Sequence, residues 1–146
     1  MKRILCPTDF SDGAAGAERQ AAGLARALGA ELLLLHVVNE SPLWSETLYT
    51  ADVRRVFAGR RTWAEQALTA RTKTLAADGV TARGAVRSGV AWREIIAAAR
   101  DERVDMIVMG TQGRTGLDRL LMGSVAERVV CLAACPVLTV RCSSAT

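Results

Sequence analysis

The chain has 146 residues, of which 50% are hydrophobic and 23% charged. This composition fits one soluble globular domain over residues 1–146 and excludes a disordered chain. The net charge is only +4, and basic residues never run longer than pairs, so we expect no nucleic-acid partner. No apolar run approaches the ~20 residues of a membrane helix, and no secretory leader is recognisable. We therefore expect no membrane partner and a cytoplasmic location.

Cysteine and histidine usage argues against a metal site. Cys6, Cys131, Cys135 and Cys142 show neither CxxC nor zinc spacing, and His36 is the only histidine. We expect reduced thiols that pack as small buried hydrophobes. Catalysis by His36 would need a partner that no nearby residue suggests, so we expect a packed, hydrogen-bonded histidine.

Apolar runs and helical periodicity alternate along the chain. Short apolar runs predict five strands, at residues 2–6, 31–38, 81–87, 103–108 and 137–140. The third of these is polar enough to be an edge strand. Helical spacing predicts four helices between them, from Ser11 or Asp12 to Gly29, over 52–77, around 92–99, and from 123 to 135.

All four helices carry apolar residues at helical spacing. The first has Ala17, Ala21, Leu24 and Leu28, and the third has Trp92, Ile95, Ile96 and Ala99. The long helix has Val53, Val56, Phe57, Ala64, Ala67, Leu68 and Leu75 on one side, and the last helix has Val125, Val129, Leu132 and Ala133. The first helix is alanine-rich, so it can pack close to a sheet. Most aromatic residues lie in segment 44–63, which we expect to fill the outer core rather than to form a lid or a partner surface.

This alternation predicts an α/β fold with a parallel sheet and helices on both faces. In such sheets, ligands bind beyond the carboxyl ends of the strands, where the strand order reverses. The loops with the most unusual residues are 7–13 and 110–123, after the first and fourth strands. A strand order of 3-2-1-4-5, taken as a hypothesis, would place both loops at one crevice.

The second loop has the features of a phosphate cradle. Gly110 and Gly113 keep the loop thin, so that backbone can approach a ligand closely. Gly123, Ser124 and Val125 open a helix, where free N–H groups and the positive end of the helix dipole attract an anion. The Ser124 hydroxyl can also donate to a phosphate oxygen.

Other residues fit the remaining parts of a nucleotide. Arg114 and Arg119 could pair with phosphate oxygens. Asp9 can accept hydrogen bonds from a ribose or a base amino group, or hold a metal-bound water. Val37 could offer backbone groups and an apolar contact to a base. The loop is neither a P-loop, since the lysine is absent and the spacing differs, nor a GxGxxG dinucleotide motif. Glycine spacing alone leaves open that these glycines are only turns.

Three stretches together resemble the universal stress protein family. Residues 4–11, which read ILCPTDFS, resemble the opening strand and loop of the family, and residues 35–38 resemble its second strand. The glycines match the family's nucleotide-binding signature, G-x2-G-x9-G-[S/T]. The resemblance covers essentially the whole chain. Gln112 and Ala91 stand where histidine and proline are common, but neither change removes a backbone donor.

The resemblance implies a Rossmann-like, adenine nucleotide alpha hydrolase-like fold with strand order 3-2-1-4-5. It also implies a homodimer, often formed through the last strand, here residues 137–141. The implied ligand is ATP, with Mg²⁺ or Mn²⁺ bridging its phosphates. Asp9 and Val37 would contact adenine and ribose, and the glycine loop would hold the phosphates. The full set of implied nucleotide-binding residues is Pro7, Thr8, Asp9, Val37, Met109, Gly110, Gly113, Arg114, Gly123, Ser124 and Val125.

The sequence leaves three functions open. We favour a nucleotide-dependent regulatory module with no catalytic residue, because no base is placed to activate water. The second is slow ATP hydrolysis or self-phosphorylation, with Ser124, Thr111 or Thr115 as the acceptor. The third is a dimeric scaffold that binds no nucleotide.

Overall fold

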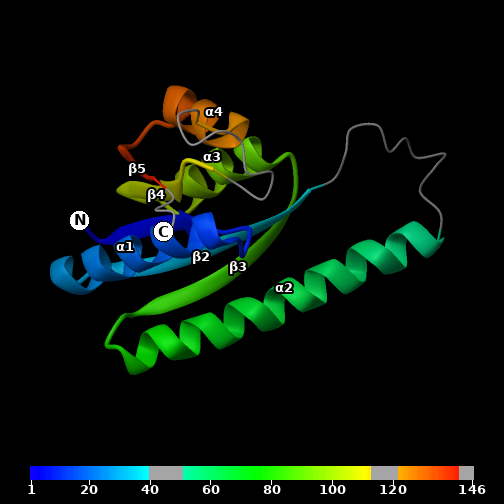
Figure 1. The fold of residues 1–146 in the computed structure, drawn as a ribbon, viewed down its shortest axis with the longest axis horizontal. Helices are drawn as coiled ribbons and strands as arrows, with labels where there is room; N and C mark the ends of the chain where they lie inside the picture. Colours follow the sequence, from blue (N-terminus) through cyan, green and yellow to red (C-terminus); the bar gives the residue numbers. More distant parts are fainter. Residues whose placement is uncertain (40–50, 113–121, 142–146) are drawn as a thin grey trace, which may run out of the picture.

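A computed structural model describes residues 1–39, 51–112 and 122–141 (Figure 1). In these residues, strands and helices alternate as predicted. The strands are β1 (Arg3–Pro7), β2 (Glu31–Asn39), β3 (Ala82–Gly89), β4 (Met106–Gly110) and β5 (Val137–Val140). The helices are α1 (Asp12–Leu28), α2 (Ala51–Ala77), α3 (Ala91–Asp101) and α4 (Ser124–Leu132). None of these helices is long and apolar enough to cross a membrane.

The strands form one parallel sheet in the order β3-β2-β1-β4-β5, which confirms the predicted order. Helices α1 and α2 cover one face of the sheet, and α3 and α4 cover the other (Figure 1). Because β1 and β4 are neighbours and parallel, the loops that follow them leave the sheet at the same edge.

The leucine run of β2 explains why both faces are covered. Leu32, Leu33, Leu34 and Leu35 are each at most 1% exposed. Leu32 and Leu34 pack with the alanines of α1, whereas Leu33 and Leu35 pack with α3 and α4. Alternation along a strand sends successive side chains to opposite faces, so an uninterrupted apolar run needs cover on both.

Helix α1 begins and ends where the sequence predicts. The Ser11 hydroxyl accepts a hydrogen bond from the Ala14 N–H at 3.2 Å, and Gly29 ends the helix with a left-handed φ of 63°. Ala17, Ala21 and their neighbours form its buried face and bring the helix close to the sheet.

The predicted buried side of α2 is confirmed in part: Leu75 packs against the core, and Val53, Phe57 and Ala67 are half-buried. Only Ala64 and Leu68 are buried, while Val56 and Trp63 are 54% and 53% exposed. The amino-terminal end of α2 extends past the sheet (Figure 1). Trp63 meets the edge of the Phe10 ring but leaves half of its side chain exposed. Trp63 therefore does not fill the outer core as expected. The aromatics Trp44 and Tyr49 lie outside the described residues.

Three smaller predictions also fail. Leu132, in the last turn of α4, is 54% exposed, while its neighbour Ala133 packs against the core. Cys131, on the same turn, is exposed rather than buried, whereas Cys6 is buried as predicted; Cys142 lies outside the described residues. The fourth strand starts at Met106 and not at Arg103, because Arg103 has a positive φ of 51° and belongs to the turn that ends α3.

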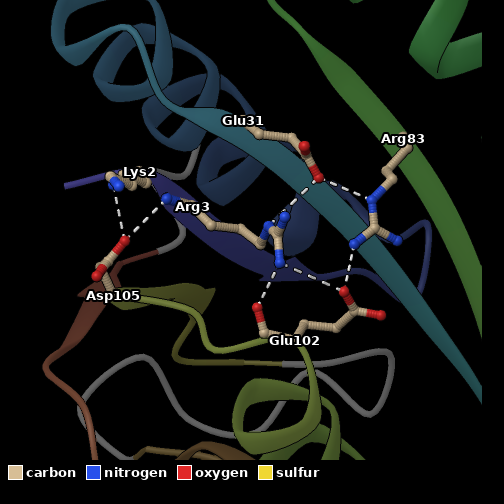
Figure 2. Close-up of polar contacts among 6 residues, drawn as sticks. All are labelled: Lys2, Arg3, Glu31, Arg83, Glu102 and Asp105. Carbon is tan, nitrogen blue, oxygen red and sulfur yellow. Dashed lines mark hydrogen bonds and ion pairs between the residues drawn. The ribbon is translucent and has the colours of Figure 1, made fainter.

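Charged side chains join the strands at the amino edge of the sheet (Figure 2). The Arg83 guanidinium binds the Glu31 carboxylate at 2.7 Å and also pairs with Glu102. The Arg3 guanidinium lies 3.4 Å from Glu31 and donates to the Glu102 carbonyl at 2.5 Å. This alternating network ties the end of α3 to the first three strands. It lies at the opposite edge from the loops that follow β1 and β4, so we assign it to stability.

Asp105 extends the same network on the other side of β1 (Figure 2). Its carboxylate accepts hydrogen bonds from the backbone N–H groups of Lys2, at 2.7 Å, and Arg3, at 2.9 Å. These two hydrogen bonds lower the pKa of Asp105, so they are retained at neutral pH and lost only in acid.

Candidate functional site

Strands β1 and β4 end side by side at Pro7 and Gly110 and release two loops at the carboxyl edge of the sheet. The first loop is short and leads directly into α1. The second leaves β4 and returns at the start of α4. In doubly wound sheets this edge is where ligands bind.

Thr8, which follows β1, is buried and fully hydrogen-bonded. Its N–H donates to the Leu35 carbonyl at 2.8 Å, and its own carbonyl accepts a hydrogen bond from His36 Nδ1 at 2.8 Å. The hydroxyl donates to Glu18 at 2.5 Å and accepts the Phe10 N–H at 3.0 Å. Thr8 therefore fixes the loop through protein contacts. The prediction of a packed, hydrogen-bonded His36 is confirmed.

Asp9 lies in a tight turn at the start of α1. Its carboxylate accepts the Ser11 N–H at 3.0 Å, and Ser11 in turn caps the helix. The next residue, Phe10, has a left-handed φ of 63°, a conformation that costs energy for a bulky residue and that surrounding contacts must hold. The Asp9 carboxylate is thus fixed beside the first turn of α1.

Two glycines let the loops meet backbone to backbone. A Cβ atom on Gly110 would lie 3.0 Å from the Gly13 carbonyl oxygen. A Cβ on Gly13 would lie 2.8 Å from the carbonyl oxygen of Gln112. The end of β4 therefore passes directly against the first turn of α1. Sequence reasoning found Gly110 but missed Gly13, although a glycine in the first turn of a helix was a visible signal.

Backbone hydrogen bonds of Thr111 join the start of the second loop to its end at Gly123 and to strand β5. The Thr111 carbonyl accepts the Gly123 N–H at 2.6 Å, and the Thr111 N–H donates to Val140 at 3.1 Å. In this structure the Gly123 N–H donates to Thr111, and its predicted contact with a phosphate stays a prediction. Gly113 and Arg114, like Arg119 and Thr115, lie outside the described residues.

Helix α4 begins at the same edge of the sheet, next to the end of β4. Gly123 is the N-cap residue and makes no side-chain cap hydrogen bond. The Glu127 N–H makes the first helical hydrogen bond, to the Gly123 carbonyl at 2.9 Å. Ser124 is exposed and Val125 packs on the core. The N–H groups of the first turn and the helix dipole form an arrangement that suits an anion.

The remaining predicted residues lie at or near the carboxyl ends of β1, β2 and β4. Met109 is 5% exposed and packs in the apolar cluster beneath α3 and α4, and Val37 packs against the same cluster. Pro7 is the last residue of β1 and pairs with Leu35 of β2. The structure therefore places Pro7, Asp9, Gly110 and Ser124 at one edge, with Val37 and Met109 on one face of the sheet.

Two contacts at this edge were not predicted. Glu18 of α1 accepts the Thr8 hydroxyl and also pairs with Arg71 of α2. The signal for Glu18 was present, since it lies between two buried alanines on the packed side of α1. Arg71 had no such signal, because only the tertiary placement of α2 brings it there.

Comparisons with known proteins agree with this architecture. The model of the universal stress protein family matches residues 1–141. A universal stress protein of Methanocaldococcus jannaschii is 37% identical over 141 residues, which cover 96% of this chain and 82% of that protein. The structure of UspA from Lactobacillus plantarum superposes with a TM-score of 0.87 at 27% identity and covers 96% of this chain and 97% of its own.

Two further structures with the same fold contain nucleotides. One is a universal stress protein in complex with cAMP, with a TM-score of 0.69 and 21% identity over 97% of this chain and 98% of that one. The other, from Archaeoglobus fulgidus, is a complex with dAMP, with a TM-score of 0.66 and 20% identity over the same shares. At these identities the likeness shows the fold alone, and the ligands are those of the two proteins.

Proposed function

Since this chain belongs to the universal stress protein family, we propose that it binds ATP and acts as a nucleotide-dependent regulatory module. The observation that supports this most is the backbone contact between Gly13 and Gly110, which brings the Asp9 turn against the strand that leads to α4. One ligand could then meet a carboxylate and a helix amino terminus together.

The triphosphate would lie at the start of α4. The Ser124 hydroxyl and the N–H groups of Ser124 and Val125 would donate to phosphate oxygens, in keeping with the dipole of that helix. Gly110, Gly113 and Arg114 would complete the cradle. Gly123 could join it if ligand binding broke its 2.6 Å hydrogen bond to Thr111.

The nucleoside would lie on the side of β1 and β2. Asp9 would accept hydrogen bonds from the ribose or the base amino group, while Val37 and Met109 offer apolar contacts at the ends of their strands. Pro7 and Thr8 set the position of Asp9 through the backbone.

A divalent cation fits this arrangement only as a partner of the phosphates. Among residues 1–39, 51–112 and 122–141, no three His, Cys, Asp or Glu side chains gather to hold a metal ion. Mg²⁺ or Mn²⁺ would therefore take its ligands from phosphate oxygens and water, which Mg²⁺ commonly does. Its contribution would be to neutralise charge between the phosphates.

Thermal unfolding tests the proposal. We expect millimolar ATP with Mg²⁺ to raise the melting temperature. When the ATP concentration is a hundred times its Kd, the free energy of unfolding should increase by about 2.7 kcal/mol. Asp9→Asn should reduce the shift, yet keep the turn, since its amide oxygen can still accept the Ser11 N–H. No shift in the unsubstituted protein at millimolar ATP would refute nucleotide binding and leave the scaffold function. Phosphate release or protein labelling in the same samples would instead reveal an enzyme.

We further propose that the protein forms a homodimer through β5 and residue Arg141. Strand β5 is an edge of the sheet, and apolar side chains nearby are exposed, with Val130 at 43% and Leu138 at 39%. An open edge strand offers unpaired backbone groups to a second copy.

Light scattering after size exclusion tests the dimer. The expected mass is twice the 15.6 kDa of the chain. Leu138→Lys should shift the protein to the monomer, because it places a charge on the apolar edge, whereas Leu28→Lys, at an exposed position at the end of α1, should not. A monomeric mass for the unsubstituted protein would contradict the proposal.

A further inference from the structure

We infer that Glu18 and Arg71 are positioning residues for the candidate nucleotide site, and that they couple helix α2 to the Asp9 loop through Thr8. The inference rests on the proposed function, because it assigns to these residues control of nucleotide affinity. Glu18 lies in α1 and Arg71 in α2, and neither belongs to the predicted binding set.

The first part of the argument is the path of contacts. The Arg71 guanidinium pairs with one oxygen of Glu18, and the other oxygen accepts the Thr8 hydroxyl at 2.5 Å. That hydroxyl in turn accepts the Phe10 N–H at 3.0 Å. The Asp9 carboxylate lies between these two anchored residues of the loop. Every step is a polar contact between named atoms, so a shift of α2 reaches the loop directly.

Burial makes this path costly to break. The Glu18 side chain is only 12% exposed and that of Arg71 is 34% exposed, while Thr8 is 5% exposed. A carboxylate in such surroundings needs its cation, since an unpaired buried charge is strongly unfavourable. Loss of Arg71 therefore leaves the Glu18 carboxylate without its cation, and a displaced Glu18 disturbs the Thr8 hydrogen bond.

A second contact joins α2 to the same loop. The Phe10 ring packs against His36 at 4.8 Å and meets Trp63 of α2 edge-on at 5.1 Å. The Arg71 guanidinium lies over this ring, 5.1 Å from its centre. These contacts hold Phe10 in its left-handed conformation, which the chain would not adopt without them. Helix α2 thus holds the loop on both sides of Asp9.

The consequence is that the docking of α2 and nucleotide affinity are linked. Any partner that moves α2 would alter the Asp9 turn, and a nucleotide that orders this turn would favour the docked helix. The coupling is a property of these side chains, since the Glu18–Arg71 pair and the contacts of Trp63 and Arg71 with Phe10 connect α2 to the loop.

Affinity measurements in single and double variants test the inference. We expect Glu18→Gln and Arg71→Gln each to weaken ATP binding about tenfold, as misplacement of a ligand-contacting group does. In the double variant the loss should be no larger than in the more affected single variant, because both residues act along one path. Thr8→Val should show a similar loss, because valine has no hydroxyl to donate to Glu18.

The matched control is Arg61→Gln. Arg61 also lies on α2, but its guanidinium reaches the Val86 carbonyl and the Ser88 hydroxyl of β3. This variant should bind ATP as the unsubstituted protein does. Equal losses in Arg61→Gln and Arg71→Gln would mean that any weakening of α2 lowers affinity, and would overturn the assigned path.

Hydrogen exchange of the Phe10 and Ser11 amides provides a readout without nucleotide. Exchange should be faster in Glu18→Gln and Arg71→Gln, and unchanged in Arg61→Gln. If the unsubstituted protein binds ATP and the two variants bind it equally well, the inference is wrong and the proposed function stands. If no form of the protein binds ATP, the proposed function fails and the link to nucleotide affinity fails with it, whatever the exchange rates show.

Discussion

Replacing Gly13 with alanine is expected to weaken ATP binding at least tenfold, because the new methyl group would displace the backbone of the second loop. Its Cβ would lie 2.8 Å from the Gln112 carbonyl oxygen, closer than carbon and oxygen pack. We also expect a loss of about 1–3 kcal/mol in the free energy of unfolding, the usual cost of overpacking. Titration calorimetry and urea unfolding measure the two effects.

Gly23→Ala is the matched control for this change. Gly23 lies in the same helix, and a Cβ there would meet nothing within 4 Å. Alanine should stabilise the helix by about 0.5–1 kcal/mol and leave ATP affinity unchanged. If Gly13→Ala behaved like Gly23→Ala, the close approach of α1 to the second loop would have no role in binding.

Leu33→Ala is expected to cost about 2–5 kcal/mol in the free energy of unfolding. Leu33 is fully buried in the centre of the sheet, beneath α3 and α4, so truncation removes apolar contacts and leaves a cavity. Urea unfolding should show a lower midpoint with an unchanged slope.

Leu28→Ala provides the comparison, since Leu28 lies at the end of α1 and is 50% exposed. Its cost should stay within about 0.5 kcal/mol. A loss at Leu33 no larger than that at Leu28 would contradict the two-faced core described for β2.

The type of each helix and strand, and their order along the chain, could be predicted because local residue patterns indicate them. The unbroken apolar run at 32–35 requires cover on both faces of the sheet, and Ser11 and Gly29 mark the ends of α1 by their own backbone preferences. Strand order needed the family resemblance. The structure gives β3-β2-β1-β4-β5, in agreement with that resemblance.

Exposure on α2 and α4 could not be predicted from helical spacing. Periodicity identifies an apolar side, but it does not show how far the sheet extends beneath a helix. Val56 and Trp63, on α2, and Leu132, in the last turn of α4, are each more than half exposed. The long helix therefore carries apolar residues that the described part of the chain leaves half exposed.

The candidate site divides in the same way. Asp9, Gly110 and Ser124 were predicted from the local signal that turn residues and glycines carry, and the structure places them at one edge of the sheet. Glu18 and Arg71 were missed because their roles exist only where α1 and α2 meet. The Gly123 N–H was assigned to a phosphate from its position in the motif, whereas the structure pairs it with Thr111. Local sequence patterns indicated which loops form the candidate site, whereas tertiary packing determined which backbone donors there are already hydrogen-bonded within the protein.

Nuclear magnetic resonance titration of the amide groups with ATP and Mg²⁺ tests the central claim most directly. The account predicts that millimolar ATP shifts the amide signals of Asp9, Gly110, Ser124 and Val125, and leaves those at the amino edge of the sheet, such as Glu31 and Glu102, in place. Absence of any shift, or shifts confined to the amino edge, would contradict a nucleotide site at the carboxyl ends of β1 and β4.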